Sequence, residues 1–192
     1  MIQTREAHTD DEAWMIELLN KADENIDKFN PREFLLAVDD ETEERFAFGR
    51  TEYIRNVDDT EYVEINSVVI LDRAEDSHGE QLVVDLVGNL NREGQNQVFS
   101  FPHDHVNVFQ SVGFSELEFE KLPDVMQERY EDKVERHGED VTPMMALPNK
   151  VEIEEEDDDD EYEKPSDVTD EEVEKIKDEL DIKEDTDTKY SV

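Results

Sequence analysis

A β-branched run, an amphipathic helix and a second apolar run follow one another in this chain and constrain its fold most strongly. Residues 61–71 are rich in Val and Ile and end in four consecutive apolar residues at 68–71. The segment after them has apolar residues at helical spacing, and residues 97–101 form the next apolar run. Because a helix that joins two strands of one sheet makes them parallel, the sequence predicts a central βαβ unit.

Shorter patterns on both sides of this unit predict the remaining elements. Residues 34–38 are a compact apolar run that ends in an acidic turn, and residues 46–53 return as a second strand, which predicts an antiparallel hairpin. Thr9 and Glu12 form a capping-box pattern at the start of an earlier helix. After the central unit we expect a short helix, a strand, a polar helix and a last strand, at residues 105–112, 114–122, 123–137 and 142–147. The expected fold class is α/β, with a mixed, mostly antiparallel sheet, one central βαβ unit and flanking helices.

Acidic residues dominate the whole chain. It contains 57 Asp and Glu against 19 Lys and Arg, a formal net charge of −38. Residues 1–150 alone carry 36 acids and 14 bases, a net charge of −22. Repulsion of this size destabilises a compact domain at low salt, whereas salt at about 1 M shortens the Debye length to about 3 Å. We therefore expect a halophilic protein that works in concentrated salt.

Composition changes abruptly after Lys150. Residues 151–192 hold 21 acids and 5 bases, and residues 154–161 are an unbroken acidic run that cannot bury apolar area. We expect a folded domain at residues 1–150 and a disordered acidic tail at residues 151–192. A second capping box predicts a short helix near residues 170–181, which would either dock a protein partner or form transiently in a solubilising tail.

The composition argues against several classes of function. The bases are not clustered, which is unlike a nucleic-acid-binding surface. No apolar stretch approaches the length of a membrane span, and the first residues lack the apolar core of a secretion signal, so we expect a cytoplasmic protein. Because the chain has no cysteine, it has neither a disulfide nor a thiolate metal site.

Four local patterns follow one another along residues 2–148. They are residues 2–7 with the helix after them, the hairpin that includes residues 47–50, the strand–turn–helix segment at 68–90, and residues 106–114 with the Gly113-Phe114 pair. In content and order they resemble the GNAT superfamily of acyl-CoA-dependent N-acetyltransferases. The resemblance implies transfer of an acetyl group from acetyl-CoA, as co-substrate, to an amine.

The resemblance also implies which residues bind acetyl-CoA. They are the backbone of Val69, Ile70 and Leu71 for the pantetheine arm, and Ser77, His78, Gly79, Glu80 and Gln81 for the pyrophosphate at a helix N-terminus. The family's phosphate loop has two glycines, whereas this segment has one and carries several acids. An ordinary strand-to-helix turn is the alternative interpretation.

Candidate catalytic residues lie on and after the two central strands. Glu64 or His103 would be the general base that deprotonates the amine. His103, Asp104 and His105 would form a proton relay or, with Asp104 as N-cap, a polar cap on the next helix. No third ligand lies nearby in the sequence, so we expect no metal site. Phe109 stands where many family members have a tyrosine general acid, and it has no hydroxyl to donate.

Three functions stay open at this point. The first is an N-acetyltransferase acting on an unknown amine. The second is a catalytically weak or inactive GNAT-fold module that binds a protein partner or senses acyl-CoA, and the third is an unrelated α/β binding protein. A splay between the strands around Val68 and Phe99, with an open tunnel, would favour the enzyme, and side chains filling that cleft would favour the inactive module. A structure without the splay would favour the unrelated protein.

Overall fold

A single mixed sheet organises the computed structural model, which describes residues 1–153. In that range seven strands lie in the order β1-β2-β3-β4-β5-β7-β6. Their bounds are β1 (Ile2–Glu6), β2 (Phe34–Asp39), β3 (Arg45–Arg55), β4 (Glu61–Ile70), β5 (Val98–Ser100), β6 (Ser115–Glu116) and β7 (Met144–Ala146). All neighbours are antiparallel except β4 and β5, which are parallel. The predicted fold class and its central βαβ unit are confirmed.

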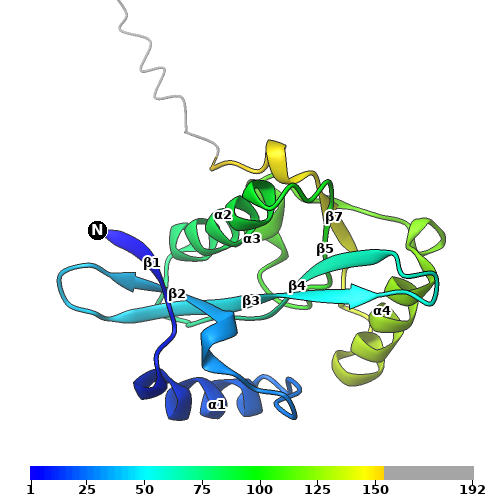
Figure 1. Cartoon of the computed structure of the whole chain (residues 1–192). Coiled ribbons are helices and arrows are strands. Elements are labelled where there is room, and N and C mark those ends of the chain that lie inside the picture. The colour runs from blue at the N-terminus through cyan, green and yellow to red at the C-terminus, as the bar shows by residue number, and fades with distance from the viewer. Residues whose placement is uncertain (154–192) are drawn as a thin grey trace, which may run out of the picture. The chain divides into compact units, whose positions relative to one another are not determined.

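Four α-helices in the described range cover both faces of the sheet. They are α1 (Glu12–Lys21), α2 (Asp76–Arg92), α3 (Val106–Ser111) and α4 (Asp124–His137). The helices α2 and α3 lie on one face, and α1 and α4 lie on the other, with α4 at the end near β5 and β7 (Figure 1). None of the helices in residues 1–153 has the length and apolar character needed to cross a bilayer.

Side chains alternate along each strand, so neighbouring residues lie on opposite faces of the sheet. On β2, Leu36 packs with Met15 and Leu19 of α1, whereas its neighbour Ala37 joins the core under α2. The face under α2 holds the largest group of buried residues, including Ile65 of β4. The helix-spaced residues Leu82, Val83, Leu86 and Leu90 of α2 are all buried in it, as their periodicity predicted.

The start of α1 differs from the prediction. A short 3-10 turn at Thr9–Asp11 precedes the helix, and the backbone N–H of His8 donates to the Asp11 carboxylate at 2.8 Å. Thr9 and Glu12 therefore do not form the predicted capping box. Asp11 is only 1% exposed and also pairs with Arg5 and Arg45, each at 2.8 Å. Burial alone would raise the pKa of Asp11, but the Arg5 guanidinium and the His8 N–H hold that pKa below its usual value.

Two other predicted boundaries were wrong. The strand expected at residues 114–122 is limited to Ser115–Glu116, because the chain then turns into a 3-10 helix at Phe119–Lys121. The sequence predicts a turn over residues 72–79 before the helix, but α2 already begins at Asp76. The predicted tail and its helix near residues 170–181 lie outside the described residues.

Gly79 has a packing role inside α2. A Cβ atom at this position would lie 2.6 Å from Ile70 Cδ1 and 3.0 Å from Val108 Cγ1. Gly88 lies in the same helix with no atom within 4 Å of an added Cβ. The missing side chain at residue 79 therefore lets β4, α2 and α3 approach one another closely.

These two glycines make a matched test of that packing. Gly88→Ala is expected to stabilise the protein by about 0.5–1 kcal/mol, because alanine is the better helix former. Gly79→Ala is expected to lose about 1 kcal/mol, because overpacking outweighs the same gain. Urea denaturation in strong salt measures both. Equal stabilisation by the two substitutions would contradict the close packing at Gly79.

Candidate functional site: a cleft between the two parallel strands

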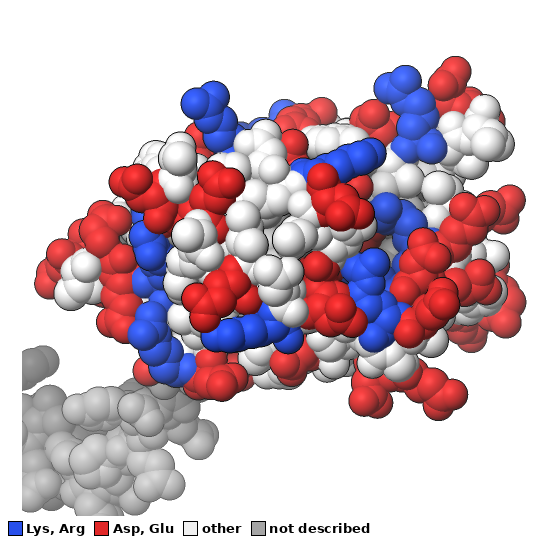
Figure 2. Space-filling view, turned by 90° about the horizontal axis from the view of Figure 1, so that it is seen from below, with Lys and Arg blue, Asp and Glu red and all other residues white. Residues whose placement is uncertain are grey.

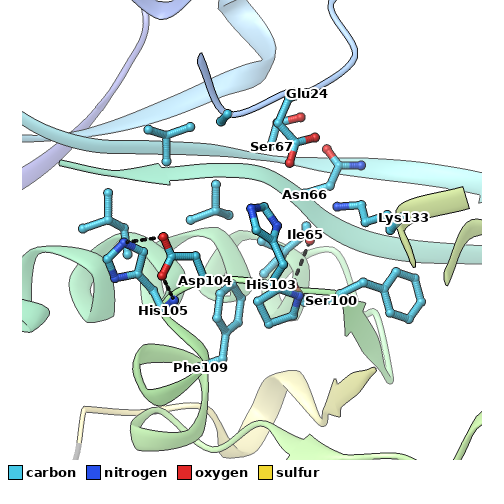
Figure 3. Close-up of a pocket in the computed structure, with 16 residues that line it drawn as sticks. Glu24, Ile65, Asn66, Ser67, Ser100, His103, Asp104, His105, Phe109 and Lys133 are labelled. Carbon is cyan, nitrogen blue, oxygen red and sulfur yellow. Dashed lines mark hydrogen bonds and ion pairs between the residues drawn. The ribbon is translucent and has the colours of Figure 1, made fainter. Parts of the chain in front are cut away.

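The two parallel strands touch only briefly and then separate. β4 and β5 pair at Glu64 with Phe99 and at Ile65 with Ser100. Where the pairing ends, the Ser100 hydroxyl donates to the Ile65 carbonyl oxygen at 2.9 Å. Beyond it, a cavity of about 90 Å³ lies between residues 65–70 of β4 and residues 100–105 after β5 (Figure 3). The expected splay between the two strands is present.

A β-bulge in β4 lies beside this cavity. Phe48 of β3 pairs with Val69, but Arg50 pairs with Asn66, so two residues of β4 oppose the single Gly49. One of the two, Ser67, has a φ of 52° and is buried. A Cβ on Gly49 would lie 2.9 Å from Val68 Cγ2, so the bulge needs glycine opposite it. The bulge turns the β4 backbone where the cavity begins.

A second, larger cavity adjoins the first. Its volume is about 770 Å³, and it shares Asn66, Ser67, Glu24 and Lys133 with the smaller cavity. Its walls come from the loop after α1, from β3 and β4, and from α4. The face of the molecule that carries α1 and α4 shows Lys and Arg interleaved with Asp and Glu (Figure 2). The bases that line the cavity are Lys28, Arg50, Arg129, Lys133 and Arg136.

Solved structures resemble this arrangement, although the sequence matches no protein-family model and no curated protein. An acetyltransferase of the GNAT family from Staphylococcus aureus Mu50 is 12% identical, with a TM-score of 0.51 over 77% of this chain and 99% of that one. The chain has the GNAT fold.

Two further GNAT-fold neighbours were solved with coenzyme A. N-acetylglutamate synthase from Neisseria gonorrhoeae, complexed with coenzyme A and N-acetyl-glutamate, is 16% identical, with a TM-score of 0.59 over 77% of this chain. This chain spans only 35% of that protein's length. Rv2747 from Mycobacterium tuberculosis, in complex with CoA, is 18% identical, with a TM-score of 0.58 over 76% of this chain and 98% of that one.

Two of the three predicted pantetheine residues lie at the open edge of the GNAT-fold cleft. Val69 and Ile70 pair with β3 on one side and line the small cavity, and β5 does not pair with them on the other side. Leu71 follows the end of β4, and its N–H donates to the Phe46 carbonyl at 2.9 Å. Leu71 does not line the cavity. The unpaired backbone edge of β4 beside the cavity therefore consists of residues 66–70 and does not include Leu71.

The predicted pyrophosphate segment forms the first turns of α2. His78 accepts the Glu75 N–H at 3.0 Å and is buried against Phe46. Glu80 accepts from the Ser111 hydroxyl at 2.7 Å, and Gln81 donates to Asp85 at 3.0 Å. Their side chains are thus engaged within the protein, whereas Ser77 is exposed. A phosphate here would meet mainly the backbone of the first turn.

Glu64 lies in a buried ion cluster. It is fully buried, pairs with Arg129, and its Oε1 lies 3.6 Å from Lys133 Nζ. Glu52 extends the cluster, because it pairs with Arg129 at 2.8 Å and accepts from Asn66. Glu64 lines neither cavity, so its carboxylate ties β4 to α4 beneath the cavity walls.

Charge pairing outweighs burial in this cluster. Burial alone would lower the pKa of Arg129, but Glu64 and then Glu52 raise that pKa above its usual value. Burial alone would likewise raise the pKa of Glu52, but Arg129, Asn66 and Arg50 bring it below its usual value. Arg129 and Glu52 are therefore both charged at neutral pH.

His103 lines the small cavity, where sequence reasoning placed it, but its partners differ from those expected. Its ring stacks on His137 with centroids 3.9 Å apart and planes 6° apart. Asp104 pairs with His105 at 3.7 Å and accepts the His105 N–H, and His105 itself occupies the N-cap of α3. Asp104 is therefore not the predicted N-cap, and His103 faces α4 instead of its sequence neighbours.

Glu24 and His137 are the site residues that sequence reasoning missed. His137 Nε2 lies 3.6 Å from Glu24 Oε1, and both side chains are less than 10% exposed. Burial lowers the pKa of His137, and His103 lowers it further, against the opposite effect of Glu24. The two residues come from the loop after α1 and the end of α4, so no spacing in the sequence signals that they meet.

The ion cluster gives a prediction about stability. Arg129→Ala is expected to cost about 3 kcal/mol, because it leaves the fully buried Glu64 with Lys133 as its remaining cation. Arg55→Ala is the control, since Arg55 is 67% exposed and its pair with Glu61 spans 3.7 Å. That control is expected to cost less than about 1 kcal/mol. Urea denaturation compares the two, and similar small losses would show that the cluster contributes little.

Proposed function

We propose that this chain binds acetyl-CoA as co-substrate and transfers its acetyl group to an amine. The observation that carries the proposal is the free edge of β4 beside the cavity between β4 and β5. Unpaired backbone N–H and C=O groups need partners, and the amides of a pantetheine arm can supply them in the manner of an added strand. The GNAT-fold neighbours solved with coenzyme A support the same ligand.

The larger cavity is the proposed entrance for the amine acceptor. It meets the small cavity at Asn66 and Ser67, so an acceptor there approaches the thioester from the side opposite the pantetheine arm. Its lining contains bases and acids, including Arg136 and Asp132, which suits a polar acceptor that carries charge of its own.

His103 is the proposed general base. It lines the small cavity, whereas Glu64 is held by Arg129 and Lys133 away from both cavities. His103 would take a proton from the acceptor ammonium, and the free amine would attack the thioester carbonyl carbon. The carbon–sulfur bond then breaks, the nitrogen loses a second proton to solvent as the amide forms, and the departing thiolate takes up a proton from solvent. Glu64 acts as a positioning residue for Arg129 and Lys133 in this proposal.

A catalytically inactive acyl-CoA-binding module is the second candidate. Phe109 favours it, because this side chain lines the small cavity and has no proton to give to a thiolate. The acids at the start of α2, Glu75, Asp76 and Glu80, also oppose a bound pyrophosphate. Strong salt weakens that repulsion, which agrees with the proposed halophilic character of the chain.

Acetyl-CoA binding is the first expected result. Calorimetry on the full-length protein in about 2 M KCl, where repulsion between its acids is screened, should show one saturable site. The nucleotide portion alone, 3′,5′-ADP, should bind more weakly, because it lacks the arm that would pair with β4. Absence of acetyl-CoA binding, in a sample shown by circular dichroism to be folded, would rule out both candidates.

Phe109→Tyr separates the enzyme from the inactive module. A phenol at this position of the cavity wall would supply the missing general acid, so an active enzyme should gain roughly tenfold in turnover of a primary amine. Phe114→Tyr is the control, because Phe114 packs edge-on against Phe109 but does not line the cavity. Thiol release from acetyl-CoA measures both variants. Acetyl-CoA binding with no turnover in any of the three proteins would favour the inactive module.

A further inference from the structure

Three side chains from distant parts of the chain meet beside the small cavity, and the proposed reaction uses only one of them. Glu24 follows α1, His103 follows β5, and His137 is the last residue of α4. One ligand atom from each lies within 4.8 Å of the others. No second group of three His, Asp or Glu residues in positions 1–153 meets this condition, despite the abundance of acids. The grouping is therefore more than a by-product of composition.

His137 carries a polar atom without a partner. Its side chain is 6% exposed, and Nε2 makes no hydrogen bond. The nearest carboxylate oxygen, Glu24 Oε1, is 3.6 Å away, which is too long for a hydrogen bond. A buried unpartnered polar group is unfavourable. The His103 ring stacks on the His137 ring and gives Nε2 no hydrogen bond.

We propose that Glu24, His103 and His137 bind a divalent transition-metal cation of the zinc class. Imidazole nitrogen and carboxylate oxygen are both common ligands of zinc. Bonds of about 2.0–2.1 Å to a tetrahedral ion place ligand atoms about 3.4 Å apart. The pair of Glu24 and His137 is already at 3.6 Å, but the two imidazole planes are parallel, so the His103 ring has to rotate out of its stack on His137 before a nitrogen of each ring can bind the same ion. Two histidines and one carboxylate leave a fourth position open, as in catalytic zinc sites.

The fourth position would open toward the cleft. Glu24 and His103 both line the small cavity, and Glu24 also lines the larger one. Figure 3 shows Glu24 reaching the small cavity from one side and His103 from the other. An ion held between them would sit where the two cavities meet and offer a site to an acceptor. It would also occupy a ring nitrogen of His103, so the metal-bound form is distinct from the form in which His103 acts as base.

Nearby cations do not block the site. Lys133 lines both cavities and, with Arg136, lowers the pKa of His137, so it opposes a bound cation. Its ammonium group, however, lies 3.6 Å from the buried Glu64 carboxylate. Imidazole ligands favour zinc and its neighbours over magnesium and calcium, which prefer all-oxygen sites. This preference separates the site from the many surface acids, which attract hard cations unspecifically.

Zinc binding by the full-length, chelator-treated protein tests the proposal directly. Calorimetry with ZnCl₂ in about 2 M KCl, a salt level that screens the surface acids, and excess Mg²⁺ should show one equivalent of tight binding. His137→Ala and Glu24→Gln should each weaken it at least about tenfold. His105→Ala is the matched control, because His105 lies two residues from His103 but pairs with Asp104; it should bind like the parent. Visible absorption of bound Co²⁺ should report tetrahedral coordination in the parent and lose it in His137→Ala.

Three outcomes would overturn the proposal. The first is binding of several zinc ions per protein, all weakly, with no tight site. The second is displacement of zinc by Mg²⁺. The third is unchanged zinc binding in His137→Ala. Glu24→Gln keeps the size of the side chain, and thermal melting without metal shows whether each variant is folded. None of these measurements uses coenzyme A, so a failure to bind zinc is distinguishable from a failure of acetyl transfer.

Discussion

The short parallel pairing of β4 with β5 is the contact on which the rest of the molecule depends. Two residue pairs and the Ser100–Ile65 hydrogen bond join the β1–β4 half of the sheet to the β5–β7 half. Because the pairing stops there, the two halves of the sheet diverge beyond Ile65 and Ser100, and both cavities lie where they diverge. The bulge at Ser67, opposite Gly49, turns the β4 backbone at the same place. The cleft is thus a consequence of strand register.

Bases are scarce in this chain, and their distribution is informative. Residues 1–150 contain 14 Lys and Arg against 36 acids, yet five of these bases line the larger cavity. Arg129 and Lys133 hold Glu64 and fasten α4 to β4, while Arg50 bridges Glu33 and Glu52 across the cavity wall. The cations therefore stabilise the walls of the site, and the remaining surface is left to acids whose repulsion strong salt screens.

Periodicity predicted the strands β2 to β5 and the helix α2, because each buries a regular face and that regularity is local. The position of His103 was predictable for a similar reason, since the residues after a central strand lie at the cleft. Glu24 and His137 were not predictable, because a loop and a helix end meet only in three dimensions. The boundary of the turn before α2 was misplaced, because Gly79 lies inside the helix and a helix glycine with close neighbours looks the same in sequence as a loop glycine.

Gly79 has a further consequence for the cleft. Ile70 lines the small cavity on one side, and its Cδ1 atom reaches the space that a side chain at residue 79 would fill. Because residue 79 has no side chain, Ile70 can pack closely against α2. A side chain at residue 79 would push Ile70 toward the cavity and make the cavity shallower. Residue 79 touches no part of the cavity itself, yet its size affects how deep the cavity is. A substitution at residue 79 can therefore change the depth of the cleft without replacing any residue that lines it.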